Sequence, residues 1–270
     1  MQESVEVSVE EKFLFDLQGY LLLKNVLTRE ECGTYLSTLD RLQSQEYPDE
    51  WLQEVPSERR ARCIPTCDRR EPGQLRFNGL LRLDPTFDAM IAHPKLMPYL
   101  KAFVQRPQLI NSWSIAKEKG SGSGMWHRGI SPTAYNCLGG VPRTQMLNVV
   151  CFLTDNGPED GCVVAIPASH KNNLNLTLGK YDGLEMPGSV AITGKAGDVF
   201  MFSEAVIHNG LRKTTDGTRS NLYFNYASYE FNVMSYDPHN NYHFWLPPEI
   251  RARFAPEQKA VTQWMEWAHS

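Results

Sequence analysis

Long apolar runs are absent from this sequence of 270 residues. A helix that crosses a bilayer needs about 20 consecutive apolar residues, and no segment approaches that length. The opening segment from Gln2 to Glu11 is acidic and lacks the basic, then apolar order of a secretory signal. We therefore expect a soluble protein of the cytoplasm.

An excess of charge of one sign is also missing. The chain has 27 Lys and Arg against 31 Asp and Glu, which gives a formal net charge of -4, and the two signs are interspersed. Proteins that bind nucleic acid or an anionic membrane surface usually carry a strong basic field, so we expect neither partner. A small-molecule partner is the remaining class, and the oligomeric state stays open.

Cysteine is scarce, with six residues in the chain. That number is too small for a disulfide scaffold in a chain of this length. Cys63 and Cys67 form the only close pair, and a Cys-x-x-x-Cys spacing with no second Cys or His pair nearby matches no standard zinc site. We expect thiols without a structural metal.

The beginning of the chain predicts a helix, a strand and a second helix. Residues Glu10 to Gln18 have a helical pattern that Gly19 ends, and the short apolar run from Tyr20 to Leu23 is typical of a buried strand. Thr28 followed by Glu31 has the spacing of a capping box, which predicts that a helix begins there.

Residues 47–79 are polar, rich in proline and contain six arginines, so we expect a long loop. These arginines could face an anionic substrate, or they could simply form a solvated surface. A further helical stretch is predicted from about Pro85 to Val104, and another helix in the tail from 247 to 270.

Between these parts, short apolar runs alternate with turn residues, which is typical of an antiparallel sandwich or barrel. The predicted strands are Leu109 to Lys117, Thr144 to Leu153, Cys162 to Ile166, Ser189 to Thr193, Asp198 to Phe202, and Asn221 to Ala227. We predict one domain over residues 1–270, with a mostly helical front and Arg-rich loop (1–106), a β-core (107–246) and a C-terminal helix (247–270).

Three motifs stand in an informative order within the β-core. They are Trp126-His127-Arg128-Gly129, then Ile166-Pro167-Ala168-Ser169-His170-Lys171, then Gly197-Asp198 followed by His208 and Arg219. This order resembles the phytanoyl-CoA dioxygenase-like family of Fe(II)- and 2-oxoglutarate-dependent oxygenases. The resemblance implies a double-stranded β-helix (jelly-roll, cupin-like) core with flanking helices, and it implies that His127 and His208 bind iron while His170 is structural.

The chemistry of these residues agrees with the resemblance. Ferrous iron in such enzymes is bound by two imidazoles and a carboxylate on one face, which leaves positions for an oxoacid and dioxygen. The distal carboxylate of a buried oxoacid needs a cation, and Arg219 offers a planar fork of donors. Lys117 is a second candidate for that carboxylate. Iron(II) and 2-oxoglutarate are therefore the expected cofactor and co-substrate.

The sequence departs from the family at Gly129, where the family's carboxylate ligand should lie two residues after His127. In one interpretation Glu204 replaces it, because positions four apart on a strand share a face and Glu204 precedes His208 by four. In a second, the position is open and binds chloride, since iron and 2-oxoglutarate halogenases resemble this chain in having a small residue there. Water is a third occupant of the same space.

The expected activity is removal of hydrogen from an aliphatic carbon of a small molecule, which is then hydroxylated or otherwise oxidised, with dioxygen as co-substrate. Chlorination is the alternative, and a non-catalytic binding or partner subunit is the second alternative. We interpret His127, Gly129, His208 and Arg219 as the catalytic constellation, and the identity of the third iron ligand as the feature that decides the reaction.

Overall fold

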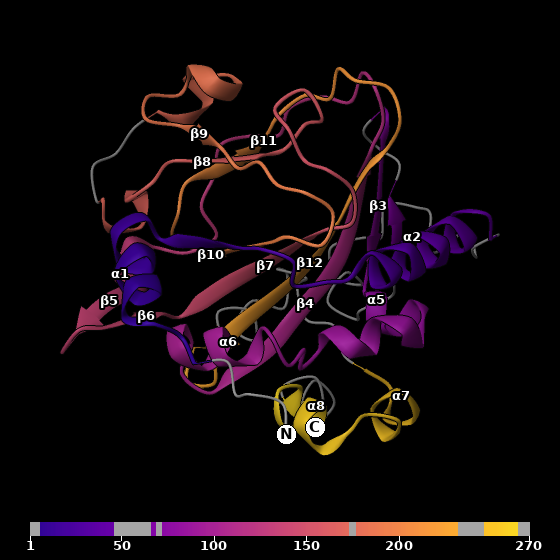
Figure 1. The fold of residues 1–270 in the computed structure, drawn as a ribbon, viewed down its shortest axis with the longest axis horizontal. Coiled ribbons are helices and arrows are strands. Elements are labelled where there is room, and N and C mark those ends of the chain that lie inside the picture. Colours follow the sequence, from indigo (N-terminus) through magenta and orange to yellow (C-terminus); the bar gives the residue numbers. More distant parts are fainter. Residues whose placement is uncertain (1–5, 46–65, 69–71, 173–176, 232–245, 264–270) are drawn as a thin grey trace, which may run out of the picture.

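The computed structural model describes residues 6–45, 66–68, 72–172, 177–231 and 246–263. Two antiparallel sheets form its centre, one of seven strands in the order β1-β10-β7-β12-β4-β3-β2 and one of three strands in the order β11-β8-β9 (Figure 1). Apolar side chains from β7 and β10 pack against others from β8 in one cluster, so the two sheets lie face to face. A separate hairpin is formed by β5 and β6.

The strands have the following bounds. In the large sheet they are β1 (Tyr20–Leu23), β2 (Thr66–Asp68), β3 (Gln74–Asn78), β4 (Pro107–Lys117), β7 (Met146–Phe152), β10 (Val199–Ser203) and β12 (Arg219–Ser228). In the small sheet and the hairpin they are β8 (Val163–Ala165), β9 (Val190–Ala191), β11 (His208–Gly210), β5 (Tyr135–Leu138) and β6 (Val141–Thr144). All six strands predicted in the β-core are present.

Helices cover the other face of the large sheet. They are α1 (Val9–Gln18), α2 (Arg29–Gln43), α5 (Leu80–Leu83), α6 (Met97–Phe103), α7 (Pro248–Ala252), α8 (Pro256–Ala260) and the 3-10 helix η1 (Pro85–Met90). Both α1 and α2 begin with a capping box, at Ser8 and at Thr28, and the second of these was predicted from the sequence. Shorter 3-10 turns are η2 (Pro132–Ala134), η3 (Ser169–Lys171), η4 (Leu178–Lys180) and η5 (Gly183–Glu185).

The pleat of β12 sends alternate residues into two different environments. Leu222 and Phe224 pack into the cluster that the helices share with the large sheet, whereas Tyr223 belongs to the cluster between the two sheets. Arg219 and Asn225 therefore point, with Tyr223, to the space between the sheets. This alternation fixes which polar residues of the sheet can contribute to a site.

Two sequence predictions need correction. The loop expected over 47–79 contains β2 and β3, and these strands extend the large sheet beyond β4. The sequence Gln-Leu-Arg-Phe-Asn of β3 alternates half-buried polar and buried apolar residues, so its strand pattern was hidden by its polarity. In place of one helix over 247–270, the structure has two short helices, α7 and α8, the second of which ends at Ala260. Residues 264–270 lie outside the described part.

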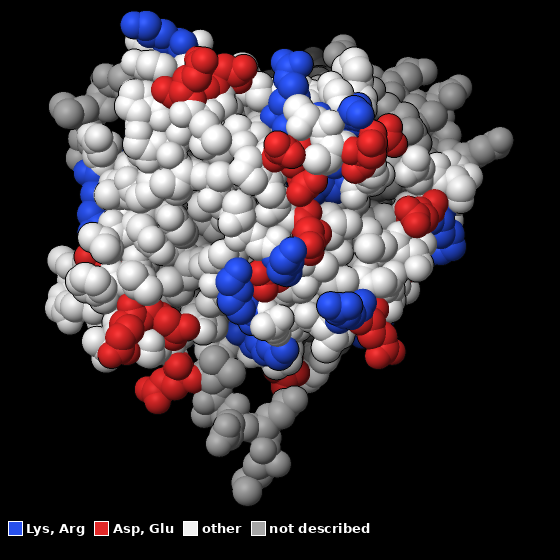
Figure 2. All heavy atoms as spheres, turned by 45° about the horizontal axis from the view of Figure 1, so that its top comes forward, with Lys and Arg blue, Asp and Glu red and all other residues white. Residues whose placement is uncertain are grey.

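The described residues include no helix long and apolar enough to cross a membrane. On the face shown in Figure 2, small groups of acidic and basic side chains are mixed, with wide uncharged areas between them. This distribution agrees with the absence of a single-sign field in the sequence. Most of the predicted Arg-rich loop (46–65 and 69–71) lies outside the described residues, so its proposed contact with an anionic substrate stays a prediction.

Candidate metal centre

His127 and His208, the two predicted metal ligands, lie side by side. Their backbones form an antiparallel bridge, in which the His127 N–H donates to the His208 carbonyl over 3.1 Å and the His208 N–H donates to the His127 carbonyl over 2.9 Å. The ring centroids are 4.2 Å apart, with 54° between the ring planes. Residues 81 positions apart in the sequence are thus brought together by the pairing of the loop around His127 with the start of β11.

Both rings are held through the same nitrogen. Nδ1 of His127 lies 2.8 Å from the carbonyl of Met125, and Nδ1 of His208 lies 3.0 Å from the carbonyl of Val206. Because a carbonyl only accepts, each Nδ1 carries the hydrogen in this arrangement and each Nε2 presents its lone pair. A backbone carbonyl behind a histidine ring is the usual support for a metal ligand.

Burial also favours a neutral ring at His208. Removal from water, and then the charge of neighbouring His127, lower the pKa of His208 to about 3. A neutral imidazole is the form that binds a metal ion. The histidine pair therefore fits two of the three protein ligands of an iron site.

Glu204 lies against Gly129, directly after β10. The Gly129 N–H donates to the Glu204 carbonyl over 2.8 Å, and a Cβ atom added at Gly129 would overlap Oε2 of Glu204 and lie 3.1 Å from its Cδ. The backbone of Gly129 does not have positive φ, so other residues could adopt it. Space, rather than backbone conformation, therefore requires glycine here, because the Glu204 carboxylate fills the place of a side chain at position 129.

The other oxygen of this carboxylate is fixed by two amides. Oε1 of Glu204 accepts hydrogen bonds from Nδ2 of Asn148, over 2.8 Å, and from Nδ2 of Asn225, over 3.2 Å. Burial raises the pKa of Glu204, while the hydrogen bond from Asn148 and the charge of nearby His127 act in the opposite direction. Both amides bind Oε1, and Oε2 is the oxygen directed at Gly129.

Over the ranges that the structure describes, no group of three His, Cys, Asp or Glu side chains is arranged to hold a metal ion. The chemistry of the donors fits iron, since two imidazoles with presented Nε2 atoms lie next to a buried carboxylate. The Glu204 carboxylate is not arranged with the two histidines as a three-ligand group in the described residues, so Glu204 as an iron ligand is a proposal.

Arg219 opens β12 and its guanidinium is buried, with 2% of the residue exposed. Nη2 donates to the Gly161 carbonyl over 2.6 Å, and Nε has no hydrogen-bond partner. None of the carboxylates in the described ranges forms an ion pair with it. A buried guanidinium without a counter-charge is costly, so this side chain is suited to bind the carboxylate of a ligand.

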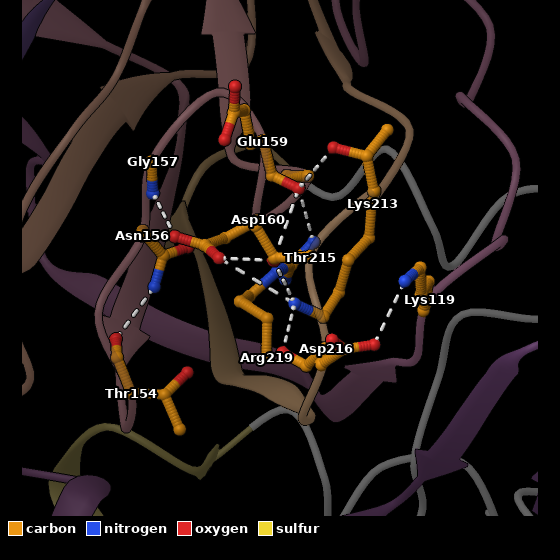
Figure 3. A network of polar contacts seen from close by, with 12 residues as sticks. Lys119, Thr154, Asn156, Gly157, Glu159, Asp160, Lys213, Thr215, Asp216 and Arg219 are labelled. Atoms are coloured by element: carbon orange, nitrogen blue, oxygen red, sulfur yellow. Dashed lines mark hydrogen bonds and ion pairs between the residues drawn. The ribbon is translucent and has the colours of Figure 1, made fainter.

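A polar network holds the turn that positions Arg219 (Figure 3). The buried Lys213 lies 3.6 Å from a carboxylate oxygen of Asp160 and donates to the Thr215 hydroxyl over 2.6 Å. Asp160 also accepts from the Thr215 hydroxyl and from the Gly157 N–H. The residue after Asp160 is Gly161, so the network fixes the carbonyl to which Arg219 donates.

Lys117, the weaker candidate for the oxoacid, is the cross-strand partner of Arg219. Its Nζ donates to the carbonyls of Gly122 and Leu211, each over 2.9 Å. These carbonyls flank the His127 loop and the end of β11, so the structure shows Lys117 joining the two segments that carry the histidines. Its binding of the oxoacid stays a prediction.

His170 was predicted to be structural, and its contacts agree with that role. It is fully buried, its Nε2 lies 3.2 Å from the Asp16 carbonyl, and its ring packs edge-on against Tyr135. Ala168, two residues before His170, adopts a left-handed conformation with φ of 64°.

Three asparagines of this site were missed in the sequence: Asn111, Asn148 and Asn225. Each lies on a predicted strand, and two of them bind Glu204. Asn225 could have been predicted from the alternation of side chains along the last strand, because Arg219 and Asn225 are an even number of residues apart and therefore lie on the same face.

Residues 15–221 match the family described as phytanoyl-CoA dioxygenase (PhyH). A curated relative, the ectoine dioxygenase of Stutzerimonas stutzeri (strain A1501), is 23% identical over 249 residues, which cover 83% of this chain and 78% of that protein.

Solved structures share the fold. HygX from Streptomyces hygroscopicus, determined with nickel, 2-oxoglutarate and hygromycin B bound, superposes with a TM-score of 0.69 at 22% identity over 83% of this chain and 88% of its own. The non-heme alpha ketoglutarate dependent epimerase SnoN from nogalamycin biosynthesis gives a TM-score of 0.59 at 18% identity, over 82% of this chain and 83% of its own. The predicted jelly-roll fold is confirmed.

Proposed function

Since the chain belongs to the phytanoyl-CoA dioxygenase family, we propose that it is an iron(II)- and 2-oxoglutarate-dependent oxygenase whose iron is bound by His127, His208 and Glu204. The observation that carries this proposal is the position of the Glu204 carboxylate in the space beside Gly129. The carboxylate that the family places two residues after the first histidine would here come from the turn after β10.

The same observation argues against chloride at position 129. A halide needs the room that a missing side chain leaves, and at Gly129 a carboxylate oxygen already lies within overlap distance of a Cβ atom. The carboxylate also brings the negative charge that a halide would otherwise supply. We therefore favour the oxygenase over the halogenase.

Arg219 supports the co-substrate. Its buried guanidinium, with Nε unpartnered, would pair with the distal carboxylate of 2-oxoglutarate. Iron, when bound here with 2-oxoglutarate and dioxygen, would supply the oxidising chemistry needed to remove hydrogen from an aliphatic carbon. The residues of the chain would bind and orient the reactants.

The substrate would be a small molecule. The relatives named above act on, or are crystallised with, small molecules, and one neighbour of the same fold is an epimerase. The proposal therefore covers hydroxylation and other oxidations of an aliphatic carbon. The position of the bound substrate would determine which of these reactions takes place.

Anaerobic iron titration tests the ligand set. We expect the wild-type chain to bind one Fe(II), and His127→Ala and His208→Ala each to weaken binding by at least about 100-fold, more than the loss of an outer-shell partner. If both variants bind iron with unchanged affinity, the assignment of His127 and His208 as iron ligands is wrong.

Two assays test the activity. We expect the purified chain to convert 2-oxoglutarate to succinate in an iron-dependent reaction. If no succinate forms, the oxygenase proposal is rejected in favour of a non-catalytic binding or partner subunit. We expect the product masses, recorded with and without chloride or bromide, to show no halogen. A halogenated product would instead support the halogenase hypothesis.

A further inference from the structure

Three buried asparagines on the inner face of the large sheet have amide oxygens without a hydrogen-bond partner. Oδ1 of Asn111, of Asn148 and of Asn225 each lacks a partner in the described structure, and the three residues are only 3%, 3% and 4% exposed. Buried polar side-chain atoms are nearly always paired, so three orphaned acceptors in one place require an explanation.

The strand register places these three residues in one row. Asn225 on β12 is the direct cross-strand partner of Asn111 on β4 and of Asn148 on β7. Adjacent strands are about 4.8 Å apart, so the row crosses three neighbouring strands at one level. Asn225 shares its face of β12 with Tyr223, which packs between the sheets, so this amide row points to the same space as Glu204.

Glu204 fixes the orientation of two of the amides. Asn148 and Asn225 both donate from Nδ2 to Oε1 of Glu204, and an ionised carboxylate can only accept. Rotation of either amide by 180° would set an oxygen against that carboxylate. The two Oδ1 atoms are therefore kept turned away from Glu204 and remain available as acceptors.

An unpaired acceptor at this depth costs about 1–3 kcal/mol for each group. A row of acceptors is matched by a ligand that brings several hydrogen-bond donors, and a protonated amino or amidinium group brings N–H donors and no acceptor.

We propose that the amide row of Asn111, Asn225 and Asn148 is a substrate subsite that recognises an amino or amidinium group through its N–H donors. This inference rests on the proposed function, since it names the substrate class of the same site. It differs from the anionic substrate suggested by the Arg-rich sequence, because the row offers acceptors and no charge for an anion.

Calorimetric titration of the full chain with Fe(II) and 2-oxoglutarate, without oxygen, tests this subsite with two cationic probes. Methylguanidinium carries N–H donors, whereas tetramethylammonium carries the same charge and none. We expect methylguanidinium to bind the wild-type chain at least about tenfold more tightly, which is the value of one buried hydrogen bond. Equal affinities, or no binding of either probe, would overturn the proposal.

Asn111 is the member of the row for which no hydrogen bond to Glu204 is seen, so it is the residue to change. We expect Asn111→Leu to lower methylguanidinium affinity about tenfold and Asn111→Asp, of similar shape, to keep or increase it. Ser112→Ala is the matched control, because Ser112 is equally buried on the same strand and its side chain points to the opposite face.

If Asn111→Leu does not fold, Asn111→Asp decides alone, and a weakened affinity in that variant overturns the subsite. An unchanged affinity in folded Asn111→Leu does the same, because water would then be the partner of the row. Succinate formation separates this result from the function itself. If the chain binds methylguanidinium more tightly than tetramethylammonium but forms no succinate, the oxygenase proposal is rejected and the subsite is kept. If the chain forms succinate but binds the two probes equally, only the subsite is rejected.

Discussion

At position 129 the chain lacks a side chain, and at position 204 it has one that fills the space. We propose that these two positions form one exchange, in which the carboxylate expected in the His127 loop is replaced by that of Glu204, in the turn after β10. An Asp at position 129 would overlap Glu204, so the present position of the Glu204 carboxylate requires glycine at 129.

This coupling predicts a rescue. We expect Glu204→Ala and Gly129→Asp each to weaken Fe(II) binding by at least about tenfold, the first by removing a ligand and the second by forcing two carboxylates together. The double variant restores the family's arrangement, so its affinity should return to within about tenfold of the wild type. Anaerobic iron titration of the four proteins measures the coupling.

Two outcomes would contradict the exchange. One is full iron affinity in Glu204→Ala, and the other is a double variant that binds iron no better than the weaker single variant, because independent sites have additive effects. Retained secondary structure, measured by circular dichroism, is the control for folding in all three variants.

Arg219 gives a second prediction at this scale. Arg219→Lys keeps the charge but loses the planar fork of donors, so we expect the KM for 2-oxoglutarate to rise at least about tenfold while kcat changes less. Initial rates of succinate formation measure both constants. Arg253→Lys is the matched control, because Arg253 also binds a carboxylate, that of Asp88, in the helical layer. An equal KM in wild type and Arg219→Lys would remove Arg219 from the oxoacid site.

Among the elements, the start of β10 is held by one buried carboxylate. Asp198 accepts from Lys24 Nζ over 2.9 Å, from the Asn25 N–H over 3.0 Å and from the Lys195 N–H over 2.9 Å. Asp198 thereby joins the connection between β1 and α2 to β10, the strand that directly precedes Glu204. Burial alone would raise the pKa of Asp198, but these three hydrogen bonds outweigh it and hold the pKa below its ordinary value of 3.8.

The sign of that shift predicts a pH dependence. A carboxyl whose pKa is lowered by folding stabilises the protein above its unfolded pKa, and this contribution is lost as the pH falls through the folded value. We expect Asp198→Asn to lower the free energy of unfolding by about 1–3 kcal/mol at neutral pH and by clearly less below about pH 3. Urea unfolding at both pH values measures the difference.

The exposed Asp216, which pairs with Lys119 at the surface, provides the control. Asp216→Asn should change the free energy of unfolding by less than about 1 kcal/mol at either pH. A destabilisation by Asp198→Asn that is equally large at acid pH would show that shape, and not charge, is what Asp198 contributes.

The elements also show what the sequence could and could not predict. The β-core strands and the capped start of α2 follow from local patterns, which the fold keeps. The pairing of His127 with His208 was expected from the family resemblance, and the structure brings the two residues together. The strand β3 was missed because its polar residues resemble a loop. The amide row depends on register between β4, β7 and β12, which no local pattern encodes. Glu204 could be raised only as one alternative, and the reason given for it was wrong, because Glu204 lies in the turn after β10 whereas His208 begins β11 of the other sheet.

For the whole molecule, the candidate site joins parts that are otherwise separate layers. His208 begins β11 of the small sheet, Glu204 follows β10 of the large sheet, and Arg219 begins β12. A metal ion with 2-oxoglutarate would therefore link the two sheets and the His127 loop at one point. Ligands that bind only the folded chain stabilise it according to their concentration relative to Kd.

This linkage predicts a cooperative rise in thermal stability. At concentrations of about 100 times Kd, Fe(II) with 2-oxoglutarate should stabilise the anaerobic wild-type chain by about 3 kcal/mol, or about 5–10 °C in Tm for a chain of this size. Removal of iron with a chelator should reverse the rise. The double variant His127→Ala with His208→Ala should show no rise at the same concentrations. If the variant and the wild type rise equally, the metal binds elsewhere. If only one of two separate transitions moves, the layers unfold independently, and the site does not tie them together.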